Sequence, residues 1–285
     1  MVNGVHIQEI KCKIILGKCG FPGGGLSINP YVGCAHDCRY CYARFMKRFT
    51  GHTDRWGSFV DVRLNAAEVL EKQLKSAKYA GQRIYIGTVT DPYQAVEKEY
   101  EITKQILNVL VQHDNPVSIL TKSDLVVRDI GLLRQLKDVD VNITINTLDE
   151  QWKEVVEPGS PSIQARLDAI QKLTESGITV NAMIGPYWPV FTDAPALLAK
   201  LKQLGVAEIF TESFNTTGSN WTGVEIAMRK RYPGALKQMK EILFDQQRFH
   251  EFYAKVEQEM KVLSRQFDLP VHIHFGRGHA GKIAS

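Results

Sequence analysis

The sequence predicts an α/β protein whose parallel strands form a partial (β/α)6 TIM-type barrel, with C-terminal helices and a short extra strand. From about residue 26 onward, short runs of β-branched residues alternate six times with longer segments of helical periodicity. The strand runs are almost continuously apolar, which is typical of parallel strands buried on both faces. Together these two patterns indicate crossover helices packed around a curled sheet.

Local residue patterns predict where the strands and helices lie. Apolar residues three and four positions apart mark one helical face after the second strand and another after the fourth. Gly81, Gly177 and Gly205 each precede an expected strand, where a left-handed helix end suits glycine. Ser160 is expected to be an N-cap, with Pro161 at the first helical position. The expected strands are residues 26–31, 83–89, 117–121, 140–146, 178–184 and 207–212, and residues 271–275 are the extra strand.

Length and composition indicate one domain of an ordinary globular protein. The chain has 285 residues, of which 44% are hydrophobic and 23% charged, without a linker or low-complexity run. We expect a single domain over 1–285, with the core barrel at about 26–215 and a helical extension at about 222–285. No run approaches the roughly 18 apolar residues of a membrane span, and the opening lacks the apolar part of a secretion signal. We therefore expect a cytoplasmic protein with no membrane partner, and a net charge of +4 identifies no other partner.

Chemically reactive residues follow five of the expected strands. The carboxyl ends of parallel strands meet at one rim of a barrel, so loops that follow different strands come together there. We therefore expect these five loops to form one site. They are "GCAHDCRYCYAR" after the first strand, "TDPYQ" after the second, "TKSD" after the third, "NT" after the fourth and "GPYWP" after the fifth.

The first of these loops places Cys34, Cys38 and Cys41 within eight positions. Five cysteines, an odd number, in a chain without a secretion signal favour metal binding or catalysis over disulfides. Thiolates are soft ligands that suit zinc or an iron–sulfur cluster. A structural zinc site normally has four protein ligands, so three ligands indicate an open coordination position. The alternative is a non-catalytic zinc or iron–sulfur site completed by Cys12, Cys19 or His36.

The motif "CAHDCRYC" resembles the CxxxCxΦC pattern of the radical S-adenosylmethionine (SAM) superfamily, with Tyr40 at the aromatic position. This resemblance implies that Cys34, Cys38 and Cys41 bind a [4Fe-4S] cluster, and that SAM chelates the open iron through its amino and carboxylate groups. It places Tyr40 against the adenine side of SAM. It also implies a reducing partner such as flavodoxin or ferredoxin.

Longer blocks are similar to spore photoproduct lyase and its relatives. The blocks are "LSINPYVGCAHDCRYCYAR", "TVTDPYQAVEKEYEITKQIL" and "SILTKSDLVVRDIGLLRQL", and the similarity runs through about residues 26–215. The lyases place a hydrogen-donating cysteine near the end of the second strand, whereas residues 84–93 contain none. The resemblance therefore implies the cofactor chemistry more strongly than the lyase reaction. It implies SAM contacts for Thr90, Lys122, Ser123, Thr144, Asn146, Met183 and Ile184.

For other residues at the rim, a structural role and a functional role are both open. Asp91 with Pro92 builds a turn whatever its function. His272 and His274 alternate on one strand face, either lining the pocket or packing at the barrel edge. Trp188 belongs either to a substrate-stacking loop or to a rigid lid.

The sequence thus predicts a radical SAM enzyme that forms a 5′-deoxyadenosyl radical and takes hydrogen from an unidentified substrate. Nucleic acid, a small molecule and a peptide all stay open as substrates. The alternatives are a DNA-repair lyase of the spore photoproduct lyase type and a non-catalytic metal-binding protein.

Overall fold

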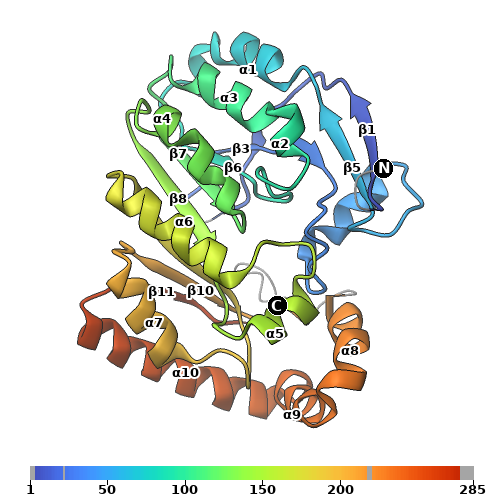
Figure 1. Cartoon of the computed structure of the whole chain (residues 1–285), viewed down its shortest axis with the longest axis vertical. Coiled ribbons are helices and arrows are strands. Elements are labelled where there is room, and N and C mark those ends of the chain that lie inside the picture. The colour runs from blue at the N-terminus through green and yellow to red at the C-terminus, as the bar shows by residue number, and fades with distance from the viewer. Residues whose placement is uncertain (1–3, 22, 217–219, 277–285) are drawn as a thin grey trace.

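The computed structural model describes residues 4–21, 23–216 and 220–276 (Figure 1). Its main feature is an eight-stranded sheet in the order β11-β10-β9-β8-β7-β6-β3-β2. All neighbours from β3 to β11 are parallel, and β2 pairs with β3 in the antiparallel direction. The strands are β2 (Gly17–Lys18), β3 (Leu26–Ile28), β6 (Ile84–Ile86), β7 (Val117–Thr121), β8 (Val139–Thr144), β9 (Thr179–Tyr187), β10 (Ile209–Ser213) and β11 (Val271–His274).

This sheet confirms the predicted partial barrel, and the six expected strands and the extra strand are all present. In the described part of the chain the edge strands β2 and β11 do not pair with each other, so the barrel is open. The first expected strand is shorter than predicted because Pro30, which has no amide N–H, interrupts the ladder. Tyr31–Val32 then forms β4, which belongs to a different sheet.

A second sheet of three strands lies beside the barrel, and the sequence analysis did not predict it. Its order is β1 (His6–Ile10), β5 (Phe59–Arg63) and β4, with β5 in the centre. Phe59, Val60 and Val62 are fully buried. The sheet places β5 next to the loop that carries the three cysteines (Figure 1).

Helices cover the outer face of the barrel sheet (Figure 1). The apolar side chains of the sheet and the facing helices form one hydrophobic core. Gly81, Gly177 and Gly205 have φ angles of +70°, +76° and +77°, as expected for left-handed positions. The elements between the strands are η1 (Tyr42–Phe49), α1 (Ala66–Leu74), η2 (Ala77–Tyr79), α2 (Glu97–Tyr100), α3 (Ile102–Leu110), η3 (Asp124–Asp129), α4 (Ile130–Leu133), α5 (Glu150–Val156), α6 (Ile163–Glu175) and α7 (Ala194–Gln203).

The start of α6 corrects one prediction. The N-cap is Ser162, whose hydroxyl accepts a hydrogen bond of 3.1 Å from the Ala165 amide, and not Ser160. The hydroxyl of Ser160 instead donates to the Glu157 carbonyl at 2.9 Å and accepts from Arg166 at 2.5 Å. Ser160 is therefore occupied by a buried polar network and does not cap the helix.

The C-terminal extension consists of α8 (Asn220–Arg231), α9 (Pro233–Phe244) and α10 (Gln246–Phe267). The long α10 packs beside α7, and its Tyr253 hydroxyl donates to the Tyr187 carbonyl at 3.0 Å. The chain then returns to the sheet as β11. No helix within the described ranges has the length and apolar character needed to cross a membrane.

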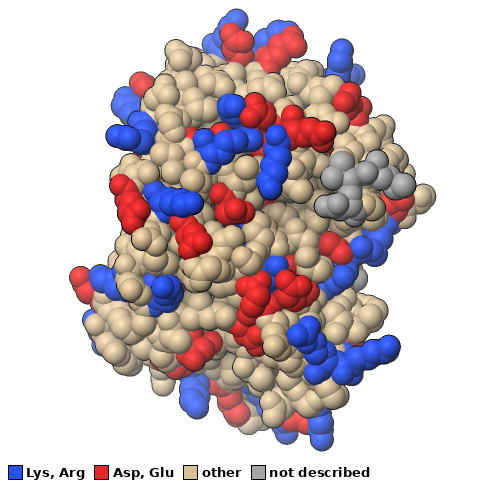
Figure 2. Space-filling view, in the orientation of Figure 1, with Lys and Arg blue, Asp and Glu red and all other residues tan. Residues whose placement is uncertain are grey.

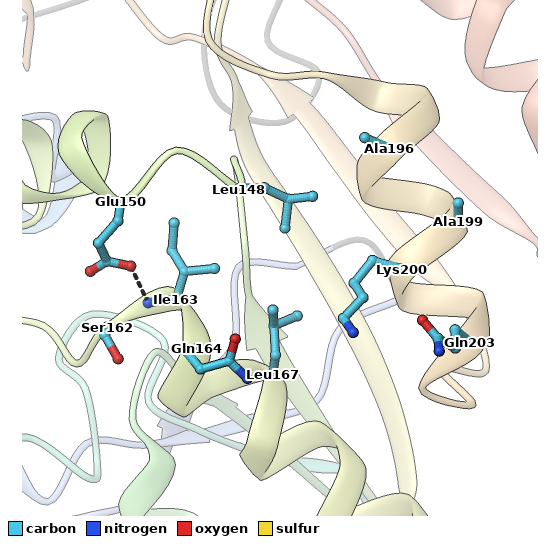
Figure 3. A pocket seen from close by; sticks show the side chains of 10 residues that line it. All are labelled: Leu148, Glu150, Ser162, Ile163, Gln164, Leu167, Ala196, Ala199, Lys200 and Gln203. Atoms are coloured by element: carbon cyan, nitrogen blue, oxygen red, sulfur yellow. Dashed lines mark hydrogen bonds between the residues drawn. The ribbon is translucent and has the colours of Figure 1, made fainter.

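A groove lies on the outside of the barrel, between α6 and α7 (Figure 3). Its lining includes Leu148, Ile163, Leu167, Ala196 and Lys200. Its lining residues come from the segment that follows β8, the start of α5, α6 with its N-cap, and α7, and none belongs to the cysteine loop. This groove is therefore separate from the site predicted at the strand ends.

Candidate active site

The three cysteines lie on the cluster loop, which we define as residues 33–41, between β4 and η1. Gly33 has a φ of +84°, and a Cβ atom there would lie 2.3 Å from the Phe59 carbonyl oxygen, so no larger residue fits. Cys34 and Cys38 are buried and Cys41 is partly exposed. Burial raises the pKa of Cys34 to about 12, and it also raises the pKa of Cys38 and Cys41. Cys41 also raises the pKa of Cys34 and of Cys38, and Cys34 raises that of Cys38, as expected for neighbouring thiols.

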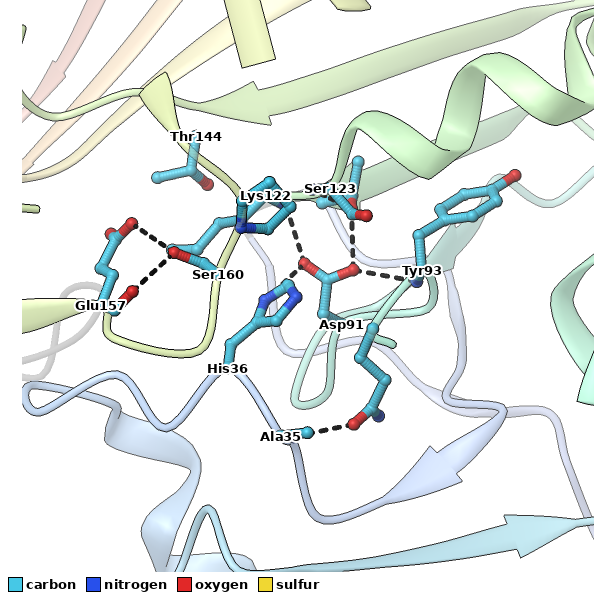
Figure 4. A network of polar contacts seen from close by, with 12 residues as sticks. Ala35, His36, Asp91, Tyr93, Lys122, Ser123, Thr144, Glu157 and Ser160 are labelled. Atoms are coloured by element: carbon cyan, nitrogen blue, oxygen red, sulfur yellow. Dashed lines mark hydrogen bonds and ion pairs between the residues drawn. The ribbon is translucent and has the colours of Figure 1, made fainter. Parts of the chain in front are cut away.

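One side of the cluster loop is held by Asp91, from the segment after β6 (Figure 4). Its carboxylate accepts hydrogen bonds from the Tyr93 amide at 2.9 Å, the Thr121 hydroxyl at 2.7 Å and the Lys122 amide at 2.7 Å. It also pairs with His36 Nδ1 at 3.3 Å. Burial alone would raise the pKa of Asp91, but His36 and these donors outweigh it and lower the pKa to about 2. Asp91 therefore joins three loops in addition to building the expected turn.

Gln94 extends this support to the start of the cluster loop. Its side chain is fully buried. Its carbonyl oxygen accepts from the Ala35 amide at 2.8 Å, and its amide nitrogen donates to the Gly33 carbonyl at 3.2 Å. The "TDPYQ" segment thus fixes the backbone on which Cys34 lies.

The other side of the cluster loop is held by the connector between α5 and α6. The Arg39 amide donates to the Val156 carbonyl at 2.8 Å, and the Gly159 amide donates to the His36 carbonyl at 3.0 Å. A Cβ atom at Gly159 would lie 2.2 Å from the Ala35 carbonyl oxygen, so the two backbones approach as closely as only glycine permits. The connector and the cluster loop are therefore joined directly through their backbones.

A buried ion pair lies beneath this connector, and the sequence analysis missed it. Arg166 Nη2 lies 2.5 Å from Glu157 Oε2, and both side chains are almost fully buried. The Tyr40 hydroxyl donates to Glu157, and the Asn146 amide nitrogen donates to the Tyr40 hydroxyl at 3.1 Å. Burial would raise the pKa of Glu157, but Arg166 and Lys122 outweigh it and lower the pKa to about 2. This network fixes the orientation of the aromatic residue in the cysteine motif.

Lys122 lies between the two sides of the loop. It is partly buried, and its ammonium nitrogen is 5.8 Å from the centre of the Tyr40 ring. Burial would lower its pKa, but Cys38 and Glu157 outweigh burial and raise it, so the side chain is charged at neutral pH. Among the described residues the ammonium has this ring contact but no hydrogen bond or ion pair. It is a cation available to a bound anion.

The other expected SAM contacts are placed as follows. Thr90 is buried with its hydroxyl 3.4 Å from the Tyr31 carbonyl, and the Ser123 hydroxyl caps η3 by accepting from the Leu125 amide at 3.2 Å. Thr144 is buried at the end of β8, and its carbonyl accepts from Arg166 at 3.0 Å. The carbonyl oxygen of the Asn146 side chain is buried and has no partner within the described chain.

The two residues of β9 that were expected to contact SAM, Met183 and Ile184, lie on opposite faces of the strand. Met183 is partly exposed, and its terminal methyl carbon would lie 2.5 Å from a Cβ atom at Gly185. Ile184 is fully buried in the main hydrophobic core, on the opposite face of the strand. The structure therefore does not bring Met183 and Ile184 together on one face.

The residues with two open interpretations also have defined surroundings. Trp188 is fully buried and contacts the Tyr40 ring edge to face at 5.2 Å, so it packs as a fixed wall. His272 is exposed, stacks on Phe210 at 4.7 Å and pairs with Glu208 at 3.1 Å, at the open edge of the barrel. The edge interpretation of His272 therefore agrees with the structure.

Glu212, at the end of β10, is a further residue of the site that sequence reasoning missed. Burial raises its pKa to about 7, and Lys122 acts in the opposite direction. Its carboxyl oxygen would lie 3.1 Å from a Cβ atom at Gly185, so this glycine makes room for it. The only signal in the sequence was an acidic residue near the end of an expected strand.

The residues present fit a [4Fe-4S] cluster with SAM bound to it. Three thiols on one loop supply soft ligands and leave one iron open. The Lys122 ammonium and the Asn146 oxygen offer a cation and an acceptor that have no polar partners within the described chain. In the described ranges no three His, Cys, Asp or Glu side chains converge on a position for a single metal ion. His36, one proposed fourth ligand of a structural site, is instead paired with Asp91.

Comparison with known families agrees with this geometry. The model of the radical SAM superfamily matches residues 28–201, and the chain belongs to this superfamily. It is therefore a radical SAM enzyme, a class whose cofactors are a [4Fe-4S] cluster and SAM. The predicted family, fold class and enzyme class are confirmed.

Sequence relatives span bacteria, archaea and viruses. An uncharacterized protein of Methanocaldococcus jannaschii is 36% identical over 202 residues, which cover 71% of this chain and 75% of the relative. An uncharacterized protein of Mycobacterium tuberculosis is 29% identical over 255 residues, 84% of this chain and 74% of the relative. A radical SAM Nalpha-GlyT isomerase of Pseudomonas phage M6 is 24% identical over 209 residues, 72% of this chain and 42% of the relative.

Solved structures share the fold. A mutant of spore photoproduct lyase with bound AdoMet and dinucleoside spore photoproduct superposes with a TM-score of 0.70 at 16% identity, covering 95% of this chain and 82% of the lyase. SuiB of Streptococcus suis bound to S-adenosylmethionine gives a TM-score of 0.56 at 15% identity, covering 89% of this chain and 50% of SuiB.

Proposed function

We propose that the enzyme cleaves SAM reductively and directs the resulting 5′-deoxyadenosyl radical to a hydrogen atom of a substrate held in the barrel. When bound, the cluster supplies the electron that splits SAM into methionine and this radical. The observation that carries the proposal is the cluster loop, held from two sides with the Lys122 ammonium between them.

Individual residues support this function through binding and orientation. Lys122 pairs with the SAM carboxylate, because a charged ammonium in a partly buried site binds an anion more strongly than one in water. The Asn146 side-chain oxygen accepts a hydrogen bond from a hydroxyl group of SAM. Tyr40, oriented by Glu157, presents its ring to the adenine side. Trp188 and Trp152, both fully buried, exclude water behind Tyr40.

The direct test is anaerobic reconstitution with iron and sulfide. We expect charge-transfer absorbance from the cluster, and deoxyadenosine when SAM and dithionite are added. Cys38→Ala should abolish both, whereas Cys19→Ala, a matched change outside the cluster loop, should leave both unchanged. A wild-type protein that binds stoichiometric zinc, contains no iron and forms no deoxyadenosine would instead support the non-catalytic alternative.

A nucleotide-containing substrate is the second candidate. Helix α8 packs on the cluster loop, since a Cβ atom at Gly223 would lie 2.6 Å from the Arg39 carbonyl oxygen. The same helix ends with Arg229, Lys230 and Arg231, which supplies cations at its far end, beyond the contact at Gly223. Spore photoproduct lyase, with the same fold, has been solved with a dinucleoside. The absence of cysteine from residues 84–93 argues against the lyase reaction itself.

Labelled substrates test this candidate. Candidate nucleosides and oligonucleotides carrying deuterium should transfer label into deoxyadenosine if they are the target. Binding of an oligonucleotide should weaken steeply with salt through counterion release, and Lys230→Glu with Arg231→Glu should weaken it further. Label transfer from a peptide or another small molecule, with none from nucleotides, would contradict the candidate.

We further propose that residues 1–285 act as one domain, in the cytoplasm, with flavodoxin or ferredoxin as the reductant. Support for one domain comes from β11, which follows the C-terminal helices and yet pairs with β10 in the barrel sheet.

A further inference from the structure

The element η1 begins at the residue after Cys41 and has two different faces. Its inner face includes Ala43, which is buried with Cys34, Trp56 and Phe59 in a small apolar cluster separate from the main core. On its outer face the side chains of Phe45 and Phe49 are 42% and 70% exposed. Two neighbouring aromatic rings left in water are typical of an interaction site.

Cations surround these exposed rings. The Arg48 guanidinium lies 5.5 Å from the centre of the Phe45 ring and 5.1 Å from that of Phe49. Residues 37–57 contain five Lys and Arg residues and two Asp residues, a net charge of +3 out of +4 for the whole chain. One of these two acids, Asp37, already pairs with Arg39 and Arg55, at 2.8 Å and 2.5 Å.

Three of the cations are not neutralised. Arg44 and Lys47 donate to backbone carbonyls, and Arg48 lies over the two rings. None of the three has an acidic partner within 4.0 Å among the described residues. The Arg44 guanidinium turns inward to the Cys38 and Arg39 carbonyls. We call the surface formed by Phe45, Lys47, Arg48 and Phe49 the η1 face. Figure 2 shows Lys and Arg side chains interspersed with Asp and Glu on the side of the molecule next to the three-stranded sheet.

We propose that the η1 face is the docking surface for a small acidic electron-carrier protein. This inference rests on the proposed function, because each reductive cleavage of SAM consumes one electron. That electron leaves the reduced carrier, which is oxidised, and enters the cluster, which is reduced; no atom or proton is transferred. Electron-carrier encounters are weak and use small interfaces, below about 1,200 Å², which suits two aromatic rings beside two cations.

The position of the η1 face favours an electron carrier over a nucleic acid. In the proposed function SAM binds on the side of the cluster loop where Lys122 lies, and the substrate must reach the radical on that same side. The η1 face lies on the outer side of η1, and Ala43 on the inner side packs with Trp56, Phe59 and Cys34 in the small apolar cluster. The element η1 alone therefore separates this face from Cys34, and a carrier docked there would lie within a short path of the [4Fe-4S] cluster. Complementary charge adds mainly to the rate of encounter.

The test measures reduction of the cluster in the reconstituted protein. Lys47→Glu with Arg48→Glu should lower the second-order rate of cluster reduction by reduced flavodoxin about tenfold at low salt, and should remove most of its salt dependence. Phe49→Ala should lower the same rate by a smaller factor. Reduction by dithionite and the affinity for SAM should not change. The matched control is Lys255→Glu with Arg265→Glu, at two exposed residues of α10, which should leave the flavodoxin rate unchanged.

Two outcomes would overturn the inference. The first is an unchanged rate in the η1 variant with both flavodoxin and ferredoxin. The second is loss of binding to a single-stranded oligonucleotide with unchanged carrier rates, which would assign the face to nucleic acid. Failure of the proposed function looks different, because wild-type protein would then form no deoxyadenosine even with dithionite.

Discussion

The two sides of the cluster loop are each held by a buried carboxylate, but the two carboxylates are compensated differently. Asp91 is surrounded by neutral donors and one histidine, most of them from the adjacent loops after β6 and β7. Glu157 faces a guanidinium from helix α6 and the hydroxyl of Tyr40. In both cases the pKa is lowered to about 2 against the effect of burial. The comparison shows that a loop can be fixed equally by many weak donors or by one strong partner.

The largest expected effect comes from removing the single strong partner. Arg166→Ala leaves Glu157 as an uncompensated buried charge, and we expect a loss of about 3–5 kcal/mol in the free energy of unfolding. Urea unfolding of the reconstituted protein under anaerobic conditions measures it. Arg134→Ala, at an exposed arginine, should change stability by less than about 0.5 kcal/mol. A loss below 1 kcal/mol for Arg166→Ala would mean that Glu157 takes up a proton or water without cost.

Removing the charge of Asp91, on the other side of the cluster loop, should lower the free energy of unfolding by a smaller amount that depends on pH. Asp91→Asn keeps the shape but replaces one acceptor oxygen with a donor group, and we expect a loss of about 1–3 kcal/mol at neutral pH. A pKa lowered from 3.8 in the unfolded chain to about 2 contributes stability that is present above the unfolded value and lost as pH falls. The difference between wild type and variant should therefore shrink between about pH 4 and pH 2. A difference that stays constant over this range would refute the assigned charge.

Lys122 contacts both sides of the cluster loop, and its replacement should affect SAM binding more than the stability of the fold. Its amide is held by Asp91, and its ammonium lies over the Tyr40 ring. Lys122→Ala should retain the cluster absorbance and weaken SAM binding about tenfold, equivalent to about 1.4 kcal/mol. Titration calorimetry measures the affinity, with Lys98→Ala, at an exposed lysine, as the control. An unchanged affinity for SAM in the Lys122 variant would exclude its proposed role.

The difference between the Asp91 side and the Glu157 side of the cluster loop also explains which parts of the site the sequence could predict. The side of the cluster loop held by Asp91 is built from residues that are close in sequence or lie at the ends of neighbouring strands. The strand pattern therefore predicted that "TDPYQ" and "TKSD" meet at the rim. The cysteine spacing is a local pattern as well. The Glu157 side depends on a pairing with Arg166 across the turn into α6, and an arginine in an amphipathic helix carries no local sign that it is buried.

The three-stranded sheet was missed for a related reason. Its strands lie far apart in sequence, and β4 has only two residues, so no run of alternating residues identifies it. Glu212 was also missed, because its pKa near 7 arises from burial, which depends on packing and not on spacing along the chain.

The backbone hydrogen bonds from Arg39 to Val156 and from Gly159 to His36 have a thermodynamic consequence. The conformational entropy of the cluster loop is lost when the barrel folds, because protein groups alone hold the loop in place. Iron and sulfide therefore meet an ordered set of thiols, and the free energy of metal binding is not spent on ordering that loop. In this respect the enzyme differs from zinc fingers, in which metal binding and folding are one event.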